Sequence, residues 1–432
     1  MTARSEGDEL SLKSTTLTRA FGPHSDGRAT SRVGFLLWSS ILTKSSIAVG
    51  LLFSTEGPYA AIGRDGLAGA RLAISEINAN AELRFQLRAE HRDPAGATER
   101  YAKLAQELIA GAGARHIIGC TTSWSRKEVI PVLEKHGAML WYPCPYEGFE
   151  CNEQVVYLGA CPNQHILPLI DYILPRFGHD IYLVGSNYIW GWETNRIARE
   201  IVEQSGGKVT GERYVTLGDD DIAHIIEDIR LKRPAFILNT LIGPSCYAFL
   251  EAYHALGEAD ADFRMDERPV ISCNLAESEA AALGNVAAGL FTIAPYFQTL
   301  QTEFNRHFLD RAREHGALDH PVSAFFVQAY AAVHLLASGL ARSSGQDGGM
   351  VLRAVTEAST PSPLGPLLIS AQNNHAVLTP HIARLESDGR LHVIVQRDDA
   401  IEPDPYLAHS RLALRDGEQP AGNTRPFLRV IK

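Results

Sequence analysis

The sequence predicts an α/β protein of two doubly wound parallel-sheet lobes joined by a hinge. Short β-rich runs alternate with segments of helical spacing, which is typical of parallel sheets covered by helices on both faces. The alternation restarts after residues 159–163, GACPN, so the chain divides into two halves. In such folds a small molecule binds beyond the carboxyl ends of the strands, in the cleft between the lobes.

Length and composition are those of a globular protein with two or three domains. The 432 residues are 45% hydrophobic and 21% charged, enough for a large core. The formal net charge of −10 repels phosphate backbones and anionic membrane surfaces, so direct nucleic-acid binding is not expected. The 6 cysteines lack zinc-ligand spacing and are expected to be mostly reduced, in an intracellular setting.

Residues 1–45 are expected to form a disordered extension, because their polar, Ser/Thr/Gly-rich composition has little apolar surface to bury. Residues 33–42, VGFLLWSSIL, are the one signal-like apolar run here, and they are too short to span a bilayer. Acidic residues precede the run, and no clear small-residue cleavage site follows it. An imperfect signal sequence and a misassigned start remain open as alternatives.

The N-terminal lobe is predicted to comprise residues 46–160 and about 290–360. Its strands are expected at IAVGLLF, FQLRA and the two apolar runs on either side of the segment TTSWSRKEVIPVLEKHG, which itself reads as a polar elbow and a helix. Helices are expected near residues 67–77, 97–112, 322–339 and 351–357, and a strand at 290–294 is expected to return to this lobe.

The C-terminal lobe is predicted to comprise residues 161–289 and about 361–406, followed by a tail of residues 407–432. Its strands are expected at residues 181–185, 209–215, 235–239, 367–369, 382–385 and 392–395. Its helices are expected over residues 166–176, 193–204, 219–231 and 245–256.

Two loops of the first lobe carry candidate ligand-binding residues. The hydroxyls of Thr122 and Ser123 stand where a helix begins, so they suit helix capping and a polar ligand equally. Tyr142, Cys144 and Pro145 lie in a proline-stiffened loop whose side chains are held ready before a ligand arrives.

The second lobe contributes candidates from two further loops. Tyr188 and Trp190 follow a predicted strand, where aromatic walls exclude water around a ligand. Thr240, after a buried strand, is a candidate for an additional wall. Because these loops are mostly uncharged, they favour a small neutral polar ligand over an amino acid.

Other chemistry is not predicted. Gly63, Gly66 and Gly69 have GxxGxxG spacing, which favours close helix–strand packing over a dinucleotide loop. The acidic run 219–221 suits a helix N-terminus, and the histidines are scattered along the chain, so no metal or other cofactor is expected. A Cys144 nucleophile with a glutamate base would suit amide hydrolysis, but the sequence context of nitrilase-type enzymes is absent, so no catalytic residue is assigned.

Several segments together resemble a known family. They are GLLFSTEG, GCTTSWSRKEVIPVLEKHGAMLWYPCPYEGFE, VYLGACPNQH, GSNYIWGWETN, IAPYF, GPLLISAQNNHAVLTPHIARL and IEPDPY. This set, from Ile47 to Tyr406, is similar to the amide-sensing negative regulators of bacterial aliphatic amidase operons. Those regulators have the type I periplasmic-binding-protein fold, which they share with receptors for urea, short-chain amides and branched-chain amino acids.

The resemblance implies a non-enzymatic sensor whose two lobes close on a small aliphatic amide or urea. It assigns ligand contacts to Ser123, Tyr142 and Tyr188 by matching motifs. Two matched positions differ: Cys144 replaces a threonine and Trp190 replaces a tyrosine, so the fold transfers more securely than the ligand.

Three functions are therefore weighed. The first is a cytoplasmic amide-responsive regulator that sequesters an RNA-binding antitermination protein. The alternative is a periplasmic receptor that delivers urea, amides or branched-chain amino acids to an ABC permease, and the second alternative is a cysteine-dependent amidase. Whether the chain forms a homo-oligomer is left open.

Overall fold

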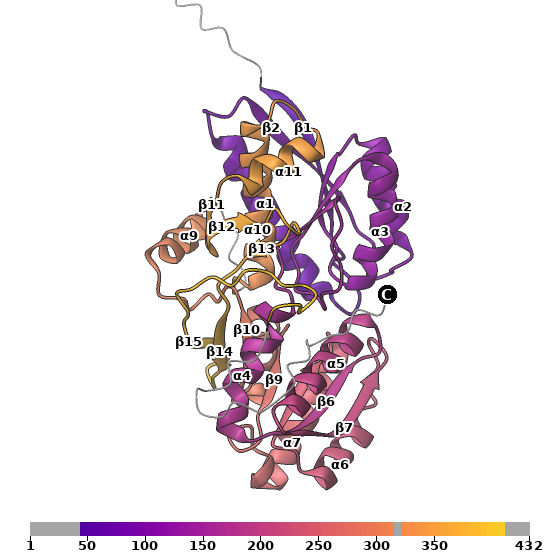
Figure 1. Ribbon diagram of the computed structural model, residues 1–432, viewed down its shortest axis with the longest axis vertical. Helices are drawn as coiled ribbons and strands as arrows, with labels where there is room; N and C mark the ends of the chain where they lie inside the picture. Colours follow the sequence, from indigo (N-terminus) through magenta and orange to yellow (C-terminus); the bar gives the residue numbers. More distant parts are fainter. Residues whose placement is uncertain (1–43, 315–320, 411–432) are drawn as a thin grey trace, which may run out of the picture. The chain divides into compact units, whose positions relative to one another are not determined.

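The computed structural model describes residues 44–314 and 321–410. The expected N-terminal extension, up to residue 43, and the expected tail beyond residue 410 lie outside these ranges. Within the described chain the helices and strands fall into two α/β lobes and a small third sheet (Figure 1).

The first lobe contains a sheet of five parallel strands in the order β2-β1-β3-β4-β5. Its strands are β1 Ser45–Leu52, β2 Phe85–Arg92, β3 His116–Gly119, β4 Met139–Tyr142 and β5 Val155–Tyr157. Its helices are α1 Ala60–Ala79, α2 Arg100–Gln106, which continues as a π-helical turn at Glu107–Gly111, α3 Ser123–His136, α10 Ala324–Arg342 and α11 Gly348–Thr356. The predicted helices of this lobe are present, and so are its predicted strands except the one at residues 290–294; β5 is an additional strand that the sequence did not reveal.

The second lobe contains a sheet of seven strands in the order β15-β14-β10-β9-β8-β6-β7. Its strands are β6 Asp180–Ser186, β7 Lys208–Val215, β8 Phe236–Thr240, β9 Val270–Ser272, β10 Phe291–Ala294, β14 His381–Leu385 and β15 Leu391–Val395. The strands from β6 to β10 pair in parallel, whereas β14 and β15 pair antiparallel.

The helices of the second lobe are α4 Ile166–Phe177, α5 Ile189–Gln204, α6 Ala223–Lys232, α7 Pro244–Ala259 and α8 Glu277–Leu283, with 3₁₀ turns at Pro162–Gln164, Ala261–Phe263 and Gly284–Ala287. Helix α9, Glu303–Glu314, lies between β10 and α10 in the chain. Neither α8 nor α9 was predicted.

Strand β10 corrects the predicted lobe boundary. Residues 290–360 were expected in the first lobe, but β10 pairs Phe291 with Ile271 of β9 and Ile293 with Ile382 of β14, both in the second sheet. A four-residue apolar run fits any buried parallel strand, so hydrophobic periodicity does not assign it to a sheet. The helical part of the prediction is right, because α10 packs against α1.

The C-terminal strands also divide differently from the prediction. Strands β14 and β15 do complete the second sheet, as expected. The expected strand at residues 367–369 instead belongs to a separate antiparallel sheet of β11 Thr360–Ser362, β12 Gly365–Ile369 and β13 Ala376–Val377. A bridge between Tyr157 and His375 ties the segment before β13 to strand β5 of the first lobe.

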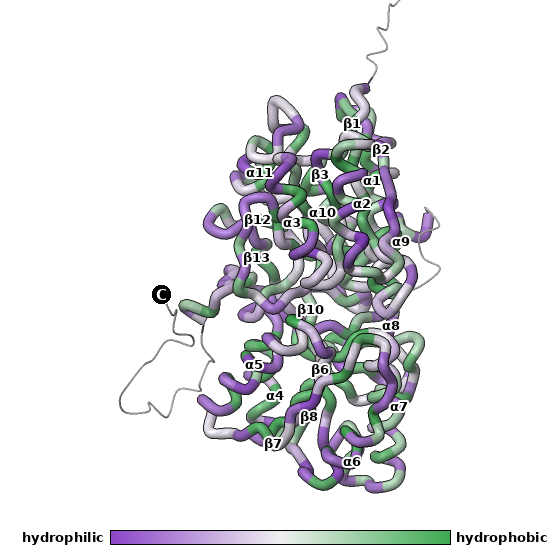
Figure 2. Tube along the Cα trace, turned by 90° about the vertical axis from the view of Figure 1, so that its right-hand side faces the viewer, coloured by the Kyte–Doolittle hydropathy of each residue, from purple (hydrophilic) through white to green (hydrophobic). Residues whose placement is uncertain are grey.

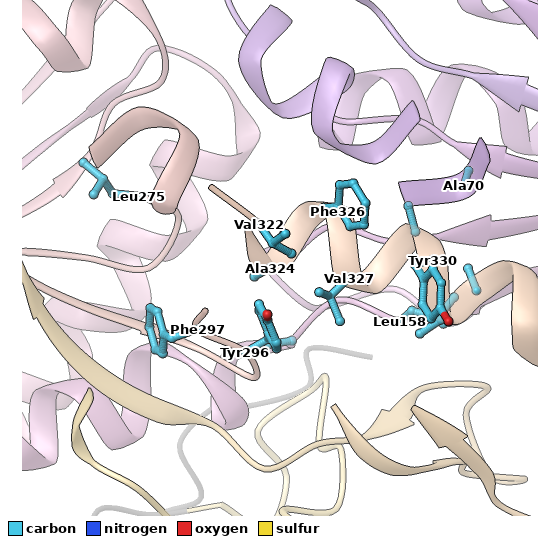
Figure 3. Close-up of a cluster of buried hydrophobic side chains, with 14 of the residues drawn as sticks. Ala70, Leu158, Leu275, Tyr296, Phe297, Val322, Ala324, Phe326, Val327 and Tyr330 are labelled. Atoms are coloured by element: carbon cyan, nitrogen blue, oxygen red, sulfur yellow. The ribbon is translucent and has the colours of Figure 1, made fainter. Parts of the chain in front are cut away.

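Helices α1 and α10 form the centre of the first lobe. A Cβ atom built on Gly69 would lie 2.1 Å from the backbone oxygen of Phe326, so glycine lets the two helices approach closely. Figure 3 shows Val322, Phe326 and Tyr330 in the buried cluster around α10. Cβ atoms built on Gly63 and Gly66 would clash with Ser54 and Phe53, which follow β1, so these two glycines give the expected close packing of helix on strand, whereas Gly69 packs helix on helix.

Helix α10 is apolar along most of its length, as its trace in Figure 2 shows. It is the one helix among the described residues that is long and apolar enough to cross a membrane. Of its most hydrophobic window, 83% is buried inside the protein, which is typical of a core helix.

Candidate functional site

Loops that follow the carboxyl ends of strands in both sheets surround one small cavity. Its volume is about 20 Å³, which is room for one or two water-sized groups. The walls are formed by Ile62, Thr121, Thr122, Ser123, Tyr142, Cys144, Pro145, Tyr188, Trp190, Ile242, Asn274 and Phe325. The cavity thus lies where doubly wound sheets place ligands.

Seven of the eight predicted site residues line this cavity, namely Thr122, Ser123, Tyr142, Cys144, Pro145, Tyr188 and Trp190. The eighth, Thr240, is fully buried and does not line it. The Thr240 hydroxyl lies 3.2 Å from the backbone oxygen of Val184 and 3.1 Å from the side-chain oxygen of Asn195, so it serves internal packing. Ile242, two residues further, provides the wall instead.

Besides Ile242, four further lining residues were not among the predicted set. Thr121 directly precedes the predicted pair of hydroxyls, so its position was available from the same elbow. Asn274 follows β9, a strand of three residues that gives too short an apolar run to recognise. Ile62 and Phe325 lie near the starts of α1 and α10, where the sequence carries no sign of a ligand.

At the turn between β3 and α3, one side chain caps the helix and its neighbour has a different hydrogen-bond partner. Thr122 caps α3: its side-chain oxygen accepts from the Ser125 backbone N–H at 3.1 Å, and the Ser125 hydroxyl accepts from the Thr122 N–H at 3.0 Å. The hydroxyl of Ser123 has a different partner, because it donates to a carboxylate oxygen of Glu147. Since the Ser123 proton is committed to that bond, its oxygen is left to accept a hydrogen bond.

A buried ionic cluster lies behind this wall. The Arg126 guanidinium, fully buried, lies 3.2 Å from a Glu147 oxygen and 2.6 Å from a Glu150 oxygen. Lys127 approaches Glu150 at 2.7 Å, and the Arg126 cation lies 4.7 Å from the ring centre of Tyr142. The positive charge of Arg126, against the effect of burial, lowers the pKa of Glu150 to about 2.

The second lobe contributes a hydrogen-bond donor to the cavity wall that has no partner among the described residues. The indole N–H of Trp190 is buried and has no hydrogen-bond partner among the described residues. In the first lobe the Thr121 hydroxyl is also buried and has no hydrogen-bond partner within the described chain. Unpartnered polar atoms in the wall of a cavity are costly unless a ligand or water meets them, so both mark places for hydrogen bonds.

The two lobes touch around the cavity. The rings of Trp124 in α3 and Tyr188 before α5 have centroids 5.1 Å apart. A Cβ atom on Gly243 would lie 1.8 Å from the backbone oxygen of Pro58, and Gly243 has a positive φ of 62°. Glycine at this position therefore permits both the backbone turn and the close approach of the lobes.

Cys144 is placed as a wall and not as a nucleophile. Its side chain is buried, and its sulfur lies 3.7 Å from the backbone oxygen of Cys120. Burial raises the pKa of the Cys144 thiol well above its usual range. Because the reactive species of cysteine is the thiolate, a raised pKa opposes nucleophilic chemistry here.

The PYEGFE loop, residues 145–150, is held from behind by a C-terminal strap, which we define as the QNNH and IEPDPY segments at residues 372–375 and 401–406. The Tyr146 hydroxyl hydrogen-bonds the His375 ring, and the two rings stack. The Phe149 N–H donates to the Pro405 oxygen at 2.9 Å. Segments far apart in the sequence thus form one support for the cavity wall.

The chain was compared with known families and structures. The sequence profile of the family described as periplasmic binding protein domain matches residues 47–412. The chain is 23% identical over 348 residues to Leu/Ile/Val-binding protein homolog 6 of Brucella abortus, covering 79% of this chain and 88% of that protein.

Solved structures share the fold. A solute binding protein of an ABC transporter from R. palustris, in complex with benzoate, is 20% identical and superposes with a TM-score of 0.72, covering 83% of this chain and 98% of the other. The branched-chain amino acid transporter substrate binding protein LivJ of Streptococcus pneumoniae, in complex with isoleucine, is 17% identical with a TM-score of 0.68, covering 81% and 100%.

These matches decide the class of protein. The two-lobe fold expected from the sequence is confirmed, and the family consists of solute-binding proteins and not of enzymes. The cysteine-dependent amidase is therefore set aside, in agreement with the raised pKa of Cys144. Profile, relatives and fold agree that the chain is a non-enzymatic solute-binding protein and belongs to the periplasmic binding protein domain family.

Proposed function

We propose that the protein binds a small neutral amide or urea between its lobes. The observation that carries this proposal is the hydrogen bond from Ser123 to Glu147, which leaves the Ser123 oxygen as an acceptor. Trp190, which lines the same cavity from the second lobe, has an unpartnered donor among the residues described, and the Thr121 hydroxyl can donate or accept a hydrogen bond. A primary amide carries the complementary groups: one carbonyl acceptor and an NH₂ donor.

Charge supports this ligand class over carboxylates and amino acids. Every side chain that lines the cavity within the described chain is uncharged, and the carboxylate of Glu147 lies directly behind Ser123. A ligand carboxylate would meet the Ser123 oxygen, itself an acceptor, and no cation among the lining residues described. A ligand ammonium would find both Glu147 and Glu150 already paired with Arg126.

A ligand-binding titration tests the class. Thermal unfolding of the full chain is followed with acetamide, propionamide and urea, and with propionate and leucine as charged controls. Binding to the folded state raises the melting temperature by mass action, so amides or urea are expected to raise it and the controls are not. A rise with leucine or propionate alone would show that the ligand class is wrong.

Closure is the second part of the proposal. A ligand stabilises the closed arrangement only through contacts to both lobes, here Ser123 and Tyr142 on one side and Tyr188 on the other. We expect Tyr188→Ala to abolish the ligand-induced decrease in radius of gyration measured by solution X-ray scattering, while the far-ultraviolet circular dichroism stays that of the wild type. Unchanged affinity and compaction in this variant would exclude Tyr188 from the site.

For the partner, we propose an ABC permease served by this protein in the periplasm. The named relatives support this choice, since the R. palustris protein belongs to an ABC transporter and LivJ to an amino acid transporter. Sequencing the N-terminus of the protein purified from the periplasmic fraction of its own host tests the compartment. Recovery from the cytoplasmic fraction only would contradict the transport role.

A second candidate is the cytoplasmic amide-responsive regulator with an RNA-binding antitermination partner. The observation that favours it is the meeting of the PYEGFE loop with the C-terminal strap, because these segments carry the resemblance to amidase regulators. A strain lacking the gene separates the two candidates. Loss of uptake of radiolabelled propionamide supports transport, whereas amidase activity without inducer supports regulation.

A further inference from the structure

Three buried carboxyl groups lie where the two lobes meet, outside the lining of the cavity. Asp65 belongs to α1 of the first lobe, and Glu277 and Glu279 belong to α8 of the second. The two helices contact each other, and the three side chains are 9%, 6% and 2% exposed. In Figure 3, Leu275, two residues before α8, lies in the same buried cluster as Ala324 at the start of α10. We call these three groups the interlobe carboxyls.

Two of the interlobe carboxyls are held by segments on the first-lobe side of the junction. Asp65 accepts from the hydroxyl of Ser323, the residue that caps α10. Glu277 accepts from the backbone N–H of Gln298 at 2.8 Å, in the segment through which the chain leaves the second sheet for α10. The surroundings of these carboxyls therefore depend on how the lobes are arranged.

The α8 carboxyls are incompletely hydrogen-bonded. One oxygen of Glu279 accepts from the Tyr247 hydroxyl at 3.2 Å, and one oxygen of Glu277 accepts from Gln298 as described. The Oε2 atom of each glutamate is buried and has no hydrogen-bond partner among the described residues. An ionised carboxylate in such a place loses its hydration without full replacement, which is costly, whereas a protonated one carries no charge. The packed junction thus favours the neutral form.

The other titratable and charged groups around Glu277 and Glu279 come from α7, α1 and the segment after β10. They are Cys246, Tyr247, Asp65, Arg64 and Tyr296. Burial raises the pKa values of Cys246, Tyr247 and Tyr296 above their usual range, so these groups are uncharged at pH 7. Arg64 is exposed, and its guanidinium donates to the Thr55 backbone oxygen at 2.9 Å. No ion pair joins Glu277 or Glu279 to a cation among the described residues.

Burial and the opposite lobe act on the two glutamates in the same direction. Burial raises the pKa of Glu277 to about 8 and that of Glu279 to about 7, and the Asp65 carboxyl adds to both increases. A movement that separates α8 from α1 admits water and increases the distance to Asp65, so it returns both pKa values toward the ordinary value. The closed arrangement therefore binds more protons than an open one.

We propose that the interlobe carboxyls are a proton-binding latch, which holds the lobes together when Glu277 and Glu279 are protonated and releases them when both are ionised. The latch goes beyond the proposed function, because it concerns closure whatever the ligand is. Protons favour the arrangement that binds more of them, so closure is favoured at low pH and this advantage is lost as pH rises toward about 8. A ligand that binds the closed arrangement is bound together with protons.

Solution X-ray scattering of the full chain without added ligand tests the latch directly. The radius of gyration is expected to increase between pH 6.5 and pH 8.5, because the open arrangement gains population as the glutamates ionise. Far-ultraviolet circular dichroism at each pH checks that the chain stays folded. A constant radius of gyration over this range would overturn the proposal.

Variants assign the effect to the interlobe carboxyls. The double variant Glu277→Gln/Glu279→Gln keeps both side chains uncharged, so at pH 8.5 it should retain the radius of gyration that the wild type has at pH 6.5. The matched control is Glu251→Gln on the exposed surface of α7, which should expand as the wild type does. Expansion of the folded double variant to the wild-type extent would contradict the proposal.

A third variant tests the contribution of the opposite lobe. Asp65→Asn removes the carboxyl of α1 and is expected to reduce the pH-dependent expansion, because the repulsion between the lobes is weakened. This variant decides the question if the double variant does not fold. Expansion equal to that of the wild type would show that the carboxyls do not act between the lobes.

A calorimetric titration with propionamide connects the latch to binding. The affinity is expected to fall at least about tenfold from pH 6.5 to pH 8.5, since each proton taken up on closure changes the affinity by up to tenfold per pH unit. The double variant should show equal affinities at the two pH values. A pH-independent affinity of the wild type would contradict the latch while retaining the amide site. Failure of every amide to bind would reject the amide site alone, because the scattering experiment tests the latch without a ligand.

Discussion

Two sets of buried glutamates, one in each lobe, show how neighbours decide ionisation. Glu150 in the first lobe lies against Arg126 and Lys127, and its pKa is lowered to about 2. Glu277 and Glu279 of α8 are buried, no ion pair joins them to a cation among the described residues, and burial raises their pKa values to about 8 and about 7. At pH 7 the glutamate of the first lobe is thus ionised, whereas in the second lobe Glu277 is mostly and Glu279 about half protonated.

This difference between the lobes affects which hydrogen-bonding groups of the cavity wall are already fixed by the protein. In the first lobe, paired charges fix Glu147, which in turn fixes the Ser123 hydroxyl, so the acceptor exists before a ligand arrives. In the second lobe, Trp190 has an unpartnered donor in the described structure and depends on what enters the cavity. On the proposed function, the ligand therefore meets a preformed acceptor in the first lobe and an unpartnered donor in the second.

The strongest test of this comparison removes the cation of the first lobe. Arg126→Met leaves Glu147 and Glu150 without their buried partner, and breaking a buried pair in this way costs about 3–5 kcal/mol. The free energy of unfolding, measured with urea at pH 7, is expected to fall by that amount. The control is Arg230→Ala, which breaks an exposed pair with Glu227 and should leave stability unchanged. If both variants lowered the free energy of unfolding by the same small amount, the Arg126 pairs would be no more important to stability than the exposed pair.

The second test uses pH, because the carboxyls of α8 bind protons in the folded state that they release on unfolding. Their folded pKa values exceed the ordinary value, so their contribution to stability is complete below that ordinary value and is lost as pH rises toward about 8. Each group contributes a slope of up to about 1.4 kcal/mol per pH unit. We expect the free energy of unfolding to decrease between pH 6.5 and 8.5.

Buried histidines do not obscure that window. The pKa values of His116, His165, His375 and His381 are lowered to about 4 by burial. Their contribution to stability is lost as pH falls from 6.5 toward 4, and it is constant above that range. Glu277→Gln is expected to flatten the slope above pH 6.5, whereas Glu251→Gln on the exposed surface of α7 should not. A wild-type slope in Glu277→Gln would show that this carboxyl is not the source.

The smallest expected effect concerns the second-lobe donor. Trp190→Phe keeps an aromatic wall and removes the N–H, so propionamide affinity should fall about three- to tenfold. Stability should change little, because the removed group has no partner in the described part of the chain. The control is Trp192→Phe, whose N–H instead donates to Asn187 at 3.0 Å. Titration calorimetry measures both, and equal affinities for Trp190→Phe and wild type would place the amide carbonyl elsewhere.

Much of the fold was accessible from the sequence because its strands and helices are strongly patterned. Helix α1 and strand β6, for example, follow from apolar periodicity alone. Strands β5 and β9 have three residues each, too few for periodicity to be recognised. The lobe assignment of β10 depends on pairing with β9 and β14, which is a property of tertiary structure.

The candidate site was predictable where residues directly follow strands. Ser123 and Tyr188 lie at the starts of the helices after β3 and β6, Tyr142 is the last residue of β4, and all three line the cavity. Thr240 also ends a strand, but its hydroxyl is taken up by Asn195, and no sequence pattern distinguishes these two outcomes. The hydrogen bond from Ser123 to Glu147 joins residues 24 positions apart in the sequence, so residue spacing likewise did not predict it.

The C-terminal strap has a consequence for engineering. Residues 145–150 owe their conformation to side chains and backbone groups near residues 375 and 405, among them His375 stacking on Tyr146 and Pro405 accepting from Phe149. A loop transplanted alone from a homologous receptor would therefore lose its supports. To change ligand specificity by grafting, the loop and the QNNH and IEPDPY segments have to be transferred together. More than two hundred residues of chain separate the loop from the QNNH segment.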